Sequence, residues 1–209
     1  MLGFCCDINT MCKKEYLLLI LIPLKLFSQN LDLKILRDIN AKSYPAWDEG
    51  MKGVSNSVIF AMPVSPVVTF VIGKTKKNEE MQRNAFCSAA AIGVALGVST
   101  GLKYIVNRTR PFTEYPNEII QRDKDVGPYS FPSGHSTSAF VMATTLSLSY
   151  KKWYVTVPAY AYASLVAYSR MRLGVHYPSD VLAGMVIGSG SAFLVWNLDK
   201  KIKKSLSKK

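Results

Sequence analysis

The stretch AFCSAAAIGVALGVSTGLKYIV, residues 85–106, contains Lys103 as its only charged residue. About 20 apolar residues in an α-helix are enough to cross a bilayer. Small residues recur here every fourth position, which gives a helix one smooth face of the kind that packs closely in membranes. The stretch therefore predicts a transmembrane helix within a bundle. The small-residue stripe comprises Ala85, Ala89, Gly93, Gly97 and Gly101.

Four more apolar stretches contain no charged residue at all. The last of them carries a second stripe of the same spacing, Gly184, Gly188 and Ala192. Five such segments in 209 residues leave too little polar face for a water-soluble bundle. The sequence thus predicts an all-α fold, a polytopic membrane helical bundle of about five to six spans. The four stretches are 58–72, 136–150, 153–168 and 181–196.

The N-terminal part of the chain has a different character. Residues 1–29 contain the apolar run 16–27 behind two lysines, which fits either a cleaved secretory signal or a short first membrane anchor. Met1 and Met11 both remain possible starts. Residues 30–53 are predicted to be an amphipathic, outward-facing segment, whose first helix has one apolar side, at the interface or on the surface. That side comprises Ile35, Leu36 and Ile39.

Positive charge predicts the orientation of the segments. The net charge of +12 would suit nucleic acid, an anionic membrane surface or a phosphorylated substrate. If every segment crosses, the basic loop 74–84, the Lys151–Lys152 pair and the tail 200–209 lie on one side, which the positive-inside rule makes cytoplasmic. The core is then 54–199, with 200–209 as a basic cytoplasmic tail. No nucleic-acid partner is expected.

Both histidines, His135 and His176, fall on the opposite, outward side. They lie within three short motifs: KYIVNRTRP at 103–111, FPSGHS at 131–136 and SRMRLGVHYPSD at 169–180. Basic residues also occur on this outward side, although Lys and Arg are usually enriched in cytoplasmic loops. Binding an anion such as phosphate is the simplest reason. Four of them are interpreted instead as a solvated face or as contacts to lipid headgroups. These are Arg108, Arg122, Lys124 and Arg172.

Together, the motifs have the residues that phosphate-ester hydrolysis needs. His176 can attack phosphorus as a neutral imidazole if Asp180, four residues on, fixes its tautomer. His135 can protonate the departing alkoxide. A positive cradle for the phosphate would come from Lys103, Arg110 and Arg170, with backbone N–H groups and the hydroxyl at Ser133 and Gly134.

The three motifs, unbroken and in this order, resemble the type 2 phosphatidic acid phosphatase superfamily, which also includes vanadium haloperoxidases and bacterial acid phosphatases. The resemblance implies a covalent phosphohistidine on His176 and a metal-independent membrane phosphatase without a cofactor. We expect no zinc site or disulfide either, because the four cysteines show no ligand spacing.

The expected substrate is a lipid phosphomonoester or diphosphate in the bilayer, in a bacterial inner membrane with the site facing the periplasm. Phosphatidic acid, phosphatidylglycerophosphate, polyprenyl diphosphates and lipid A phosphates are not distinguished by the motifs. The alternatives are a secreted soluble acid phosphatase, a vanadate-dependent haloperoxidase, and a transporter or scaffold that keeps a phosphate pocket. The oligomeric state is left open by the sequence.

Overall fold

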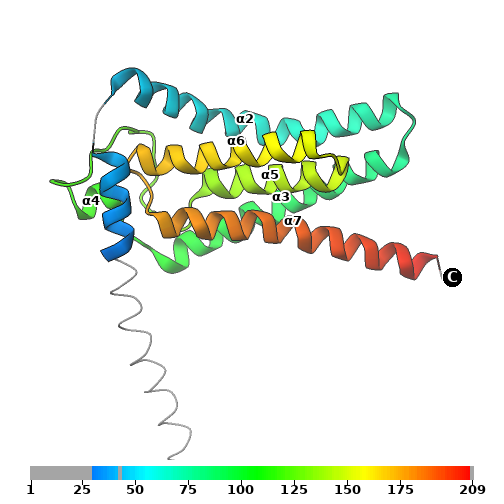
Figure 1. Ribbon diagram of the computed structural model, residues 1–209. Helices are drawn as coiled ribbons and strands as arrows, with labels where there is room; N and C mark the ends of the chain where they lie inside the picture. Colours follow the sequence, from blue (N-terminus) through cyan, green and yellow to red (C-terminus); the bar gives the residue numbers. More distant parts are fainter. Residues whose placement is uncertain (1–29, 42–43, 208–209) are drawn as a thin grey trace, which may run out of the picture.

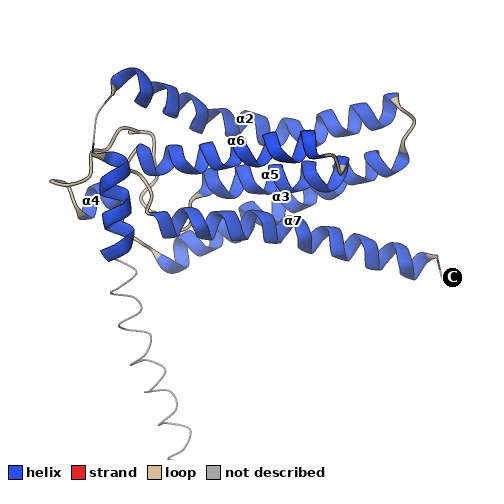
Figure 2. Cartoon of the chain, viewed as in Figure 1, coloured by secondary structure: helices blue, strands red, loops and turns tan. Residues whose placement is uncertain are grey.

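The computed structural model describes residues 30–41 and 44–207, and this part of the chain is helical with no strand (Figure 2). The all-α fold class predicted from the sequence is confirmed. A first helix covers residues 30–40. The elements that follow are α2 (Pro45–Thr75), α3 (Glu79–Val106), the short α4 (Pro111–Glu114), α5 (Gly134–Tyr150), α6 (Trp153–Arg172) and α7 (Pro178–Leu206).

The five long helices run side by side, with α5 packed against the other four (Figure 1). The α2–α3 turn, the α5–α6 turn and the C-terminus gather at one end of the bundle. At the opposite end lie α4, the loops on either side of it and the α6–α7 connection, with helix 30–40 lying across that end. All three motifs therefore meet at one end, and the basic loops lie at the other.

Within residues 30–41 and 44–207, three segments are long and apolar enough to cross a membrane: Pro45–Thr75, Glu79–Glu114 and Pro178–Leu206. The apolar stretch 58–72 lies within α2, which also runs through residue 53 and so includes the end of the 30–53 segment. The signal-like run 16–27 and the two methionines proposed as starts lie outside the described residues.

The two small-residue stripes have different environments. At Gly188 a Cβ atom would lie 2.4 Å from the backbone oxygen of Thr137, and at Gly184 it would lie 2.7 Å from that of Ser133. The stripe of α7 therefore brings its backbone against α5, as the sequence predicts. Gly97 in α3 has no atom within 4 Å of such a Cβ position, and the same holds for Gly93 and Gly101.

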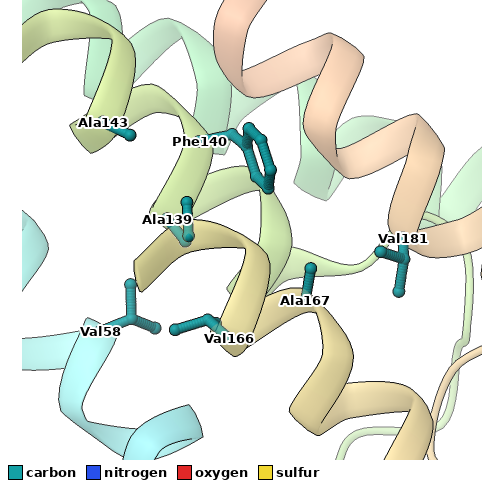
Figure 3. Packing of buried hydrophobic residues seen from close by; sticks show 8 residues of the cluster. Val58, Ala139, Phe140, Ala143, Val166, Ala167 and Val181 are labelled. Atoms are coloured by element: carbon teal, nitrogen blue, oxygen red, sulfur yellow. The ribbon is translucent and has the colours of Figure 1, made fainter. Parts of the chain in front are cut away.

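The centre of the bundle is filled mainly by small and branched side chains from four helices (Figure 3). The small alanine side chains let the helix backbones approach closely. The valines and one phenylalanine fill the remaining space between them, so the helices pack densely. Figure 3 labels Val58 of α2, Ala139, Phe140 and Ala143 of α5, Val166 and Ala167 of α6, and Val181 of α7.

Helix 30–40 is amphipathic, but its buried face is not the one predicted. Leu36 is fully buried, as expected, whereas Ile35 is 38% exposed. Asp32 and Asn40, both polar, are buried. The reason is that both side chains form hydrogen bonds with groups at the ends of α6 and α7 and in the loop after α4, so their polarity does not lead to exposure.

Candidate active site

The first motif spans the end of α3 and the start of α4. Lys103 lies on the last turn of α3, and Arg110 is the residue that precedes α4. Asn107 ends α3 in the left-handed conformation with φ of 53°, a conformation that asparagine tolerates better than most residues. Pro111 begins α4, and the four residues 107–110 separate it from the end of α3 at Val106.

The second motif forms the N-terminus of α5. Ser133 is the N-cap, and its hydroxyl accepts a hydrogen bond from Ser136 Oγ at 2.9 Å. Gly134 is the first residue of the helix and His135 the second, as the sequence indicates. The Ser133 backbone N–H donates to the backbone oxygen of Asp180 at 3.0 Å. This bond joins the second motif to the third.

The third motif spans the α6–α7 connection. Arg170 lies on the last turn of α6, His176 in the connecting loop and Asp180 in the first turn of α7. Gly174 turns the chain with φ of 73°, where a Cβ atom would lie 2.4 Å from the backbone oxygen of Ile120. A side chain at this position would thus be strained by both its backbone angle and its surroundings.

His176 lies between a carboxylate and a guanidinium. Its Nδ1 is 3.6 Å from Asp180 Oδ2, and its Nε2 is 3.5 Å from Nη1 of Arg110. The first distance is longer than a hydrogen bond, and catalytic hydrogen bonds often tighten only when substrate binds. The two ring nitrogens thus have separate neighbours, one able to orient the ring and one able to hold an anion.

His176 is 2% exposed, and its surroundings disfavour the charged ring. Burial lowers the pKa of His176 to about 3; Asp180 opposes this shift, whereas Arg170 and Arg110 add to it. The imidazole is therefore neutral near pH 7. A neutral ring keeps the lone pair that a nucleophile requires.

Asp180 is fully buried and tightly held. Its Oδ2 accepts the backbone N–H of Tyr177 at 2.9 Å, which makes Asp180 part of the α7 cap as well as the neighbour of His176. Ser130 Oγ donates a short hydrogen bond to the same oxygen. The other oxygen, Oδ1, lies 2.7 Å from Nη1 of Arg108.

The three cradle cations are placed by polar contacts. Lys103 Nζ donates to the backbone oxygens of Tyr129 and Pro132, at 3.3 and 2.9 Å. Arg110 Nη1 donates to the Val175 oxygen at 2.8 Å. Arg170, which is 1% exposed, donates to Asp123 Oδ2 at 3.0 Å and to Ser55 Oγ at 2.7 Å.

The predicted site residues thus gather at one end of the bundle, on loops and helix ends of four elements. The imidazole Nε2 of His135 is buried and has no hydrogen-bond partner within the part of the chain that the structure describes. The same residues contain no group of three or more His, Cys, Asp or Glu side chains that could hold a metal ion. The roles assigned to the individual residues stay predictions.

The interpretation of three arginines as a solvated or headgroup-contacting face is wrong. Arg108 reaches Asp180, and both Arg122 and Arg172 form ion pairs with the buried Asp48, at 2.9 and 2.8 Å. Buried carboxylates need such partners, which explains why positive charge accumulates at this end. Lys124 is exposed, as predicted.

Sequence reasoning did not find three groups that touch the site. Ser130 and Asp123 lie in an irregular loop without a pattern, so nothing in the sequence marks them. Asp32 lies far upstream, on a helix read as peripheral. The sequence did offer a signal that Arg108 lies near the site, because it is only two residues before the cradle residue Arg110.

Comparisons with known proteins identify the family of this chain. The profile of the PAP2 superfamily matches residues 84–204. Lipid A 4'-phosphatase of Bacteroides thetaiotaomicron is 26% identical over 84% of this chain and 80% of its own length. Undecaprenyl-diphosphatase of Sulfolobus acidocaldarius is 38% identical over 49% of this chain and 48% of its own.

Two solved structures resemble the fold over most of both chains. LpxE of Aquifex aeolicus has a TM-score of 0.66 and 25% identity, covering 80% of this chain and 95% of that one. The transmembrane PAP2 type phosphatidylglycerolphosphate phosphatase of Bacillus subtilis has a TM-score of 0.69 and 28% identity, covering 83% and 87%.

Proposed function

Because this chain belongs to the PAP2 superfamily, we propose that His176 is its nucleophile, Asp180 the group that orients it, and His135 its general acid. The protein is an integral membrane phosphatase that hydrolyses lipid phosphomonoesters or diphosphates through a phosphohistidine. One observation carries the assignment: the neutral, buried ring of His176 has the Asp180 carboxylate on one side and the Arg110 guanidinium on the other.

In the first step, His176 Nε2 attacks phosphorus while the bond from phosphorus to the lipid oxygen breaks. The departing oxygen takes a proton from His135, so the lipid leaves as an alcohol, or as a monophosphate if a diphosphate was cleaved. Burial and the nearby Arg170 lower the pKa of His135 to about 4, so its imidazolium forms only when the bound phosphate supplies a compensating negative charge. The ring of His176 now carries the phosphoryl group and a positive charge, which the Asp180 carboxylate stabilises. Lys103, Arg110 and Arg170 bind the equatorial phosphate oxygens.

In the second step, water attacks the phosphoryl group and the bond between phosphorus and nitrogen breaks. His135, neutral after the first step, takes the proton that the water loses. Inorganic phosphate leaves, and both histidines return to their starting states. The backbone N–H groups at the start of α5, beside Ser133 and Gly134, are proposed to face the phosphoryl oxygens throughout.

The lipid part of the substrate is proposed to lie beside the last turn of α3. Tyr104, Ile105 and Val106, which follow Lys103 directly, are 69%, 78% and 46% exposed. Apolar side chains so exposed next to a phosphate cradle suit a substrate whose tails stay in the bilayer. The names of the relatives support the same class, because lipid A and undecaprenyl diphosphate are both membrane lipids that carry phosphate.

The decisive experiment is release of inorganic phosphate by the purified, detergent-solubilised protein with EDTA present. The panel contains phosphatidic acid, phosphatidylglycerophosphate, undecaprenyl diphosphate and lipid A, with a water-soluble phosphomonoester for comparison. We expect release from at least one lipid, and faster release from it than from the soluble ester. No release from any lipid would refute the proposal.

The site is further proposed to face the periplasm, because the basic loops lie at the other end of the bundle. Two single-cysteine variants without the native cysteines test this: Ile120→Cys at the site end, where Ile120 is 50% exposed, and Lys151→Cys at the basic end. On intact cells, a membrane-impermeant maleimide should label the first and spare the second. The reverse pattern would overturn the orientation.

A further inference from the structure

The carboxylate of Asp180 is held by groups to which the proposed mechanism assigns no role. Arg108 Nη1 donates to Asp180 Oδ1 at 2.7 Å, on the oxygen that does not face His176. Asp180 is fully buried, so its charge has no contact with water. A buried carboxylate needs a cationic partner to stay ionised, and among the described residues Arg108 forms its closest ion pair.

Arg108 is itself fixed in place on several sides. Its Nη1 also donates to Ser179 Oγ at 2.7 Å, and its Nη2 donates to Asp32 Oδ2 at 3.1 Å. The guanidinium carbon lies 3.9 Å from the centre of the Tyr177 ring, a stacking distance that arginine favours. Both terminal nitrogens are therefore engaged with protein groups, which leaves this arginine poorly placed to bind phosphate directly.

Asp32 completes the arrangement from a distant part of the chain. It is 6% exposed and lies on helix 30–40, upstream of the residues that match the superfamily. Its Oδ1 accepts the Ser179 backbone N–H at 2.9 Å, and its other oxygen accepts a short bond from the Ser179 hydroxyl. Because Asp32 lies beside the first turn of α7, its negative charge is also stabilised by the positive end of that helix's dipole.

We propose that Asp32 and Arg108 are positioning residues for the reaction, and that helix 30–40 is part of the catalytic apparatus. Asp32 fixes the guanidinium of Arg108. Arg108 in turn keeps the carboxylate of Asp180 ionised and holds its orientation, so that the other carboxylate oxygen faces His176. This proposal rests on the proposed role of Asp180. Neither positioning residue touches the substrate, so their loss slows turnover without weakening substrate binding.

The test compares Asp32→Asn and Arg108→Gln, alone and combined, in the full chain, using the lipid that the wild type hydrolyses fastest. Asn keeps the size of Asp32 and removes its charge. Asp38→Asn is the matched control, because Asp38 is an exposed residue on the same helix. We expect Asp32→Asn to lower kcat about 10-fold to 100-fold at unchanged KM. The control should keep wild-type kcat, and Arg108→Lys should restore part of what Arg108→Gln loses.

The double variant decides whether the two residues act together. If Asp32 works through Arg108, adding Asp32→Asn to Arg108→Gln lowers kcat no further. Wild-type kcat in Asp32→Asn, a rise in KM instead of a fall in kcat, or fully additive losses would each overturn the proposal. If Arg108→Gln does not fold, the size of the Asp32→Asn effect against Asp38→Asn decides alone. A wild type that releases no phosphate overturns the proposed function, and this proposal with it.

Discussion

Replacing His176 with alanine is expected to abolish phosphate release, with kcat reduced by on the order of 10⁴-fold or more. The reason is that His176 supplies the nitrogen that would form the covalent intermediate, and its Nε2 lies 3.5 Å from Nη1 of the cradle residue Arg110. Initial rates of phosphate release from the best lipid substrate measure the loss. KM should change little, because the positive cradle remains.

A matched variant separates the nucleophile from the acid. His135→Ala should lower kcat for the lipid by about 10²-fold to 10⁴-fold. With an aryl phosphate, whose phenolate leaves without a proton, the first step no longer needs an acid. His135→Ala should therefore release phenolate in a rapid burst, although its second step still lacks the base, and His176→Ala should release none. Equal losses for both variants with both substrates would contradict the assigned roles.

Replacing Arg170 with alanine is expected to reduce both turnover and stability. Arg170 is 1% exposed and pairs with Asp123, which is 2% exposed, so the substitution leaves a buried carboxylate without its main partner. Breaking a buried pair in this way costs about 3–5 kcal/mol. Lys52, 3.6 Å from the other Asp123 oxygen, offsets part of that cost. The loss of a phosphate ligand should lower kcat about 10²-fold to 10³-fold.

The double variant Arg170→Ala with Asp123→Asn distinguishes the two effects. Removing the charge of Asp123 takes away the uncompensated carboxylate, so the apparent Tm in detergent should recover toward the wild-type value. Turnover should stay low, because the cation that binds phosphate is still missing. Recovery of turnover together with Tm would show that Arg170 serves only the fold. Near-normal turnover in Arg170→Ala alone would remove it from the phosphate cradle.

The sequence was most informative where a residue type has few physical alternatives. Long chargeless stretches predicted the helical bundle, because about 20 such residues leave few other options. The stripe that contains Gly184 and Gly188 predicted a close helix contact, and it packs against α5. Gly93, Gly97 and Gly101 have the same spacing and pack against nothing described, because spacing alone does not choose a partner.

Local sequence also placed much of the candidate site. His176 and Asp180 are four residues apart around a helix start, so their proximity follows from the geometry of one turn. Ser133 and Gly134 begin a helix, as the Pro-Ser-Gly run indicates. Each of these expectations concerns residues close together in the chain, where backbone geometry fixes distances.

The polar residues of helix 30–40 and of the long loop could not be placed in this way. Asp32 is 76 residues from Arg108 and 147 from Ser179, and Asp123 is 47 from Arg170. Whether a charged side chain is solvated or buried depends on whether an opposite charge arrives from another element. The sequence by itself therefore determined the helical bundle, the three motifs and the phosphatase class, and it predicted the roles of the individual site residues. Only the tertiary structure decided which charges compensate one another, because those pairs form between segments that meet only when the bundle is assembled.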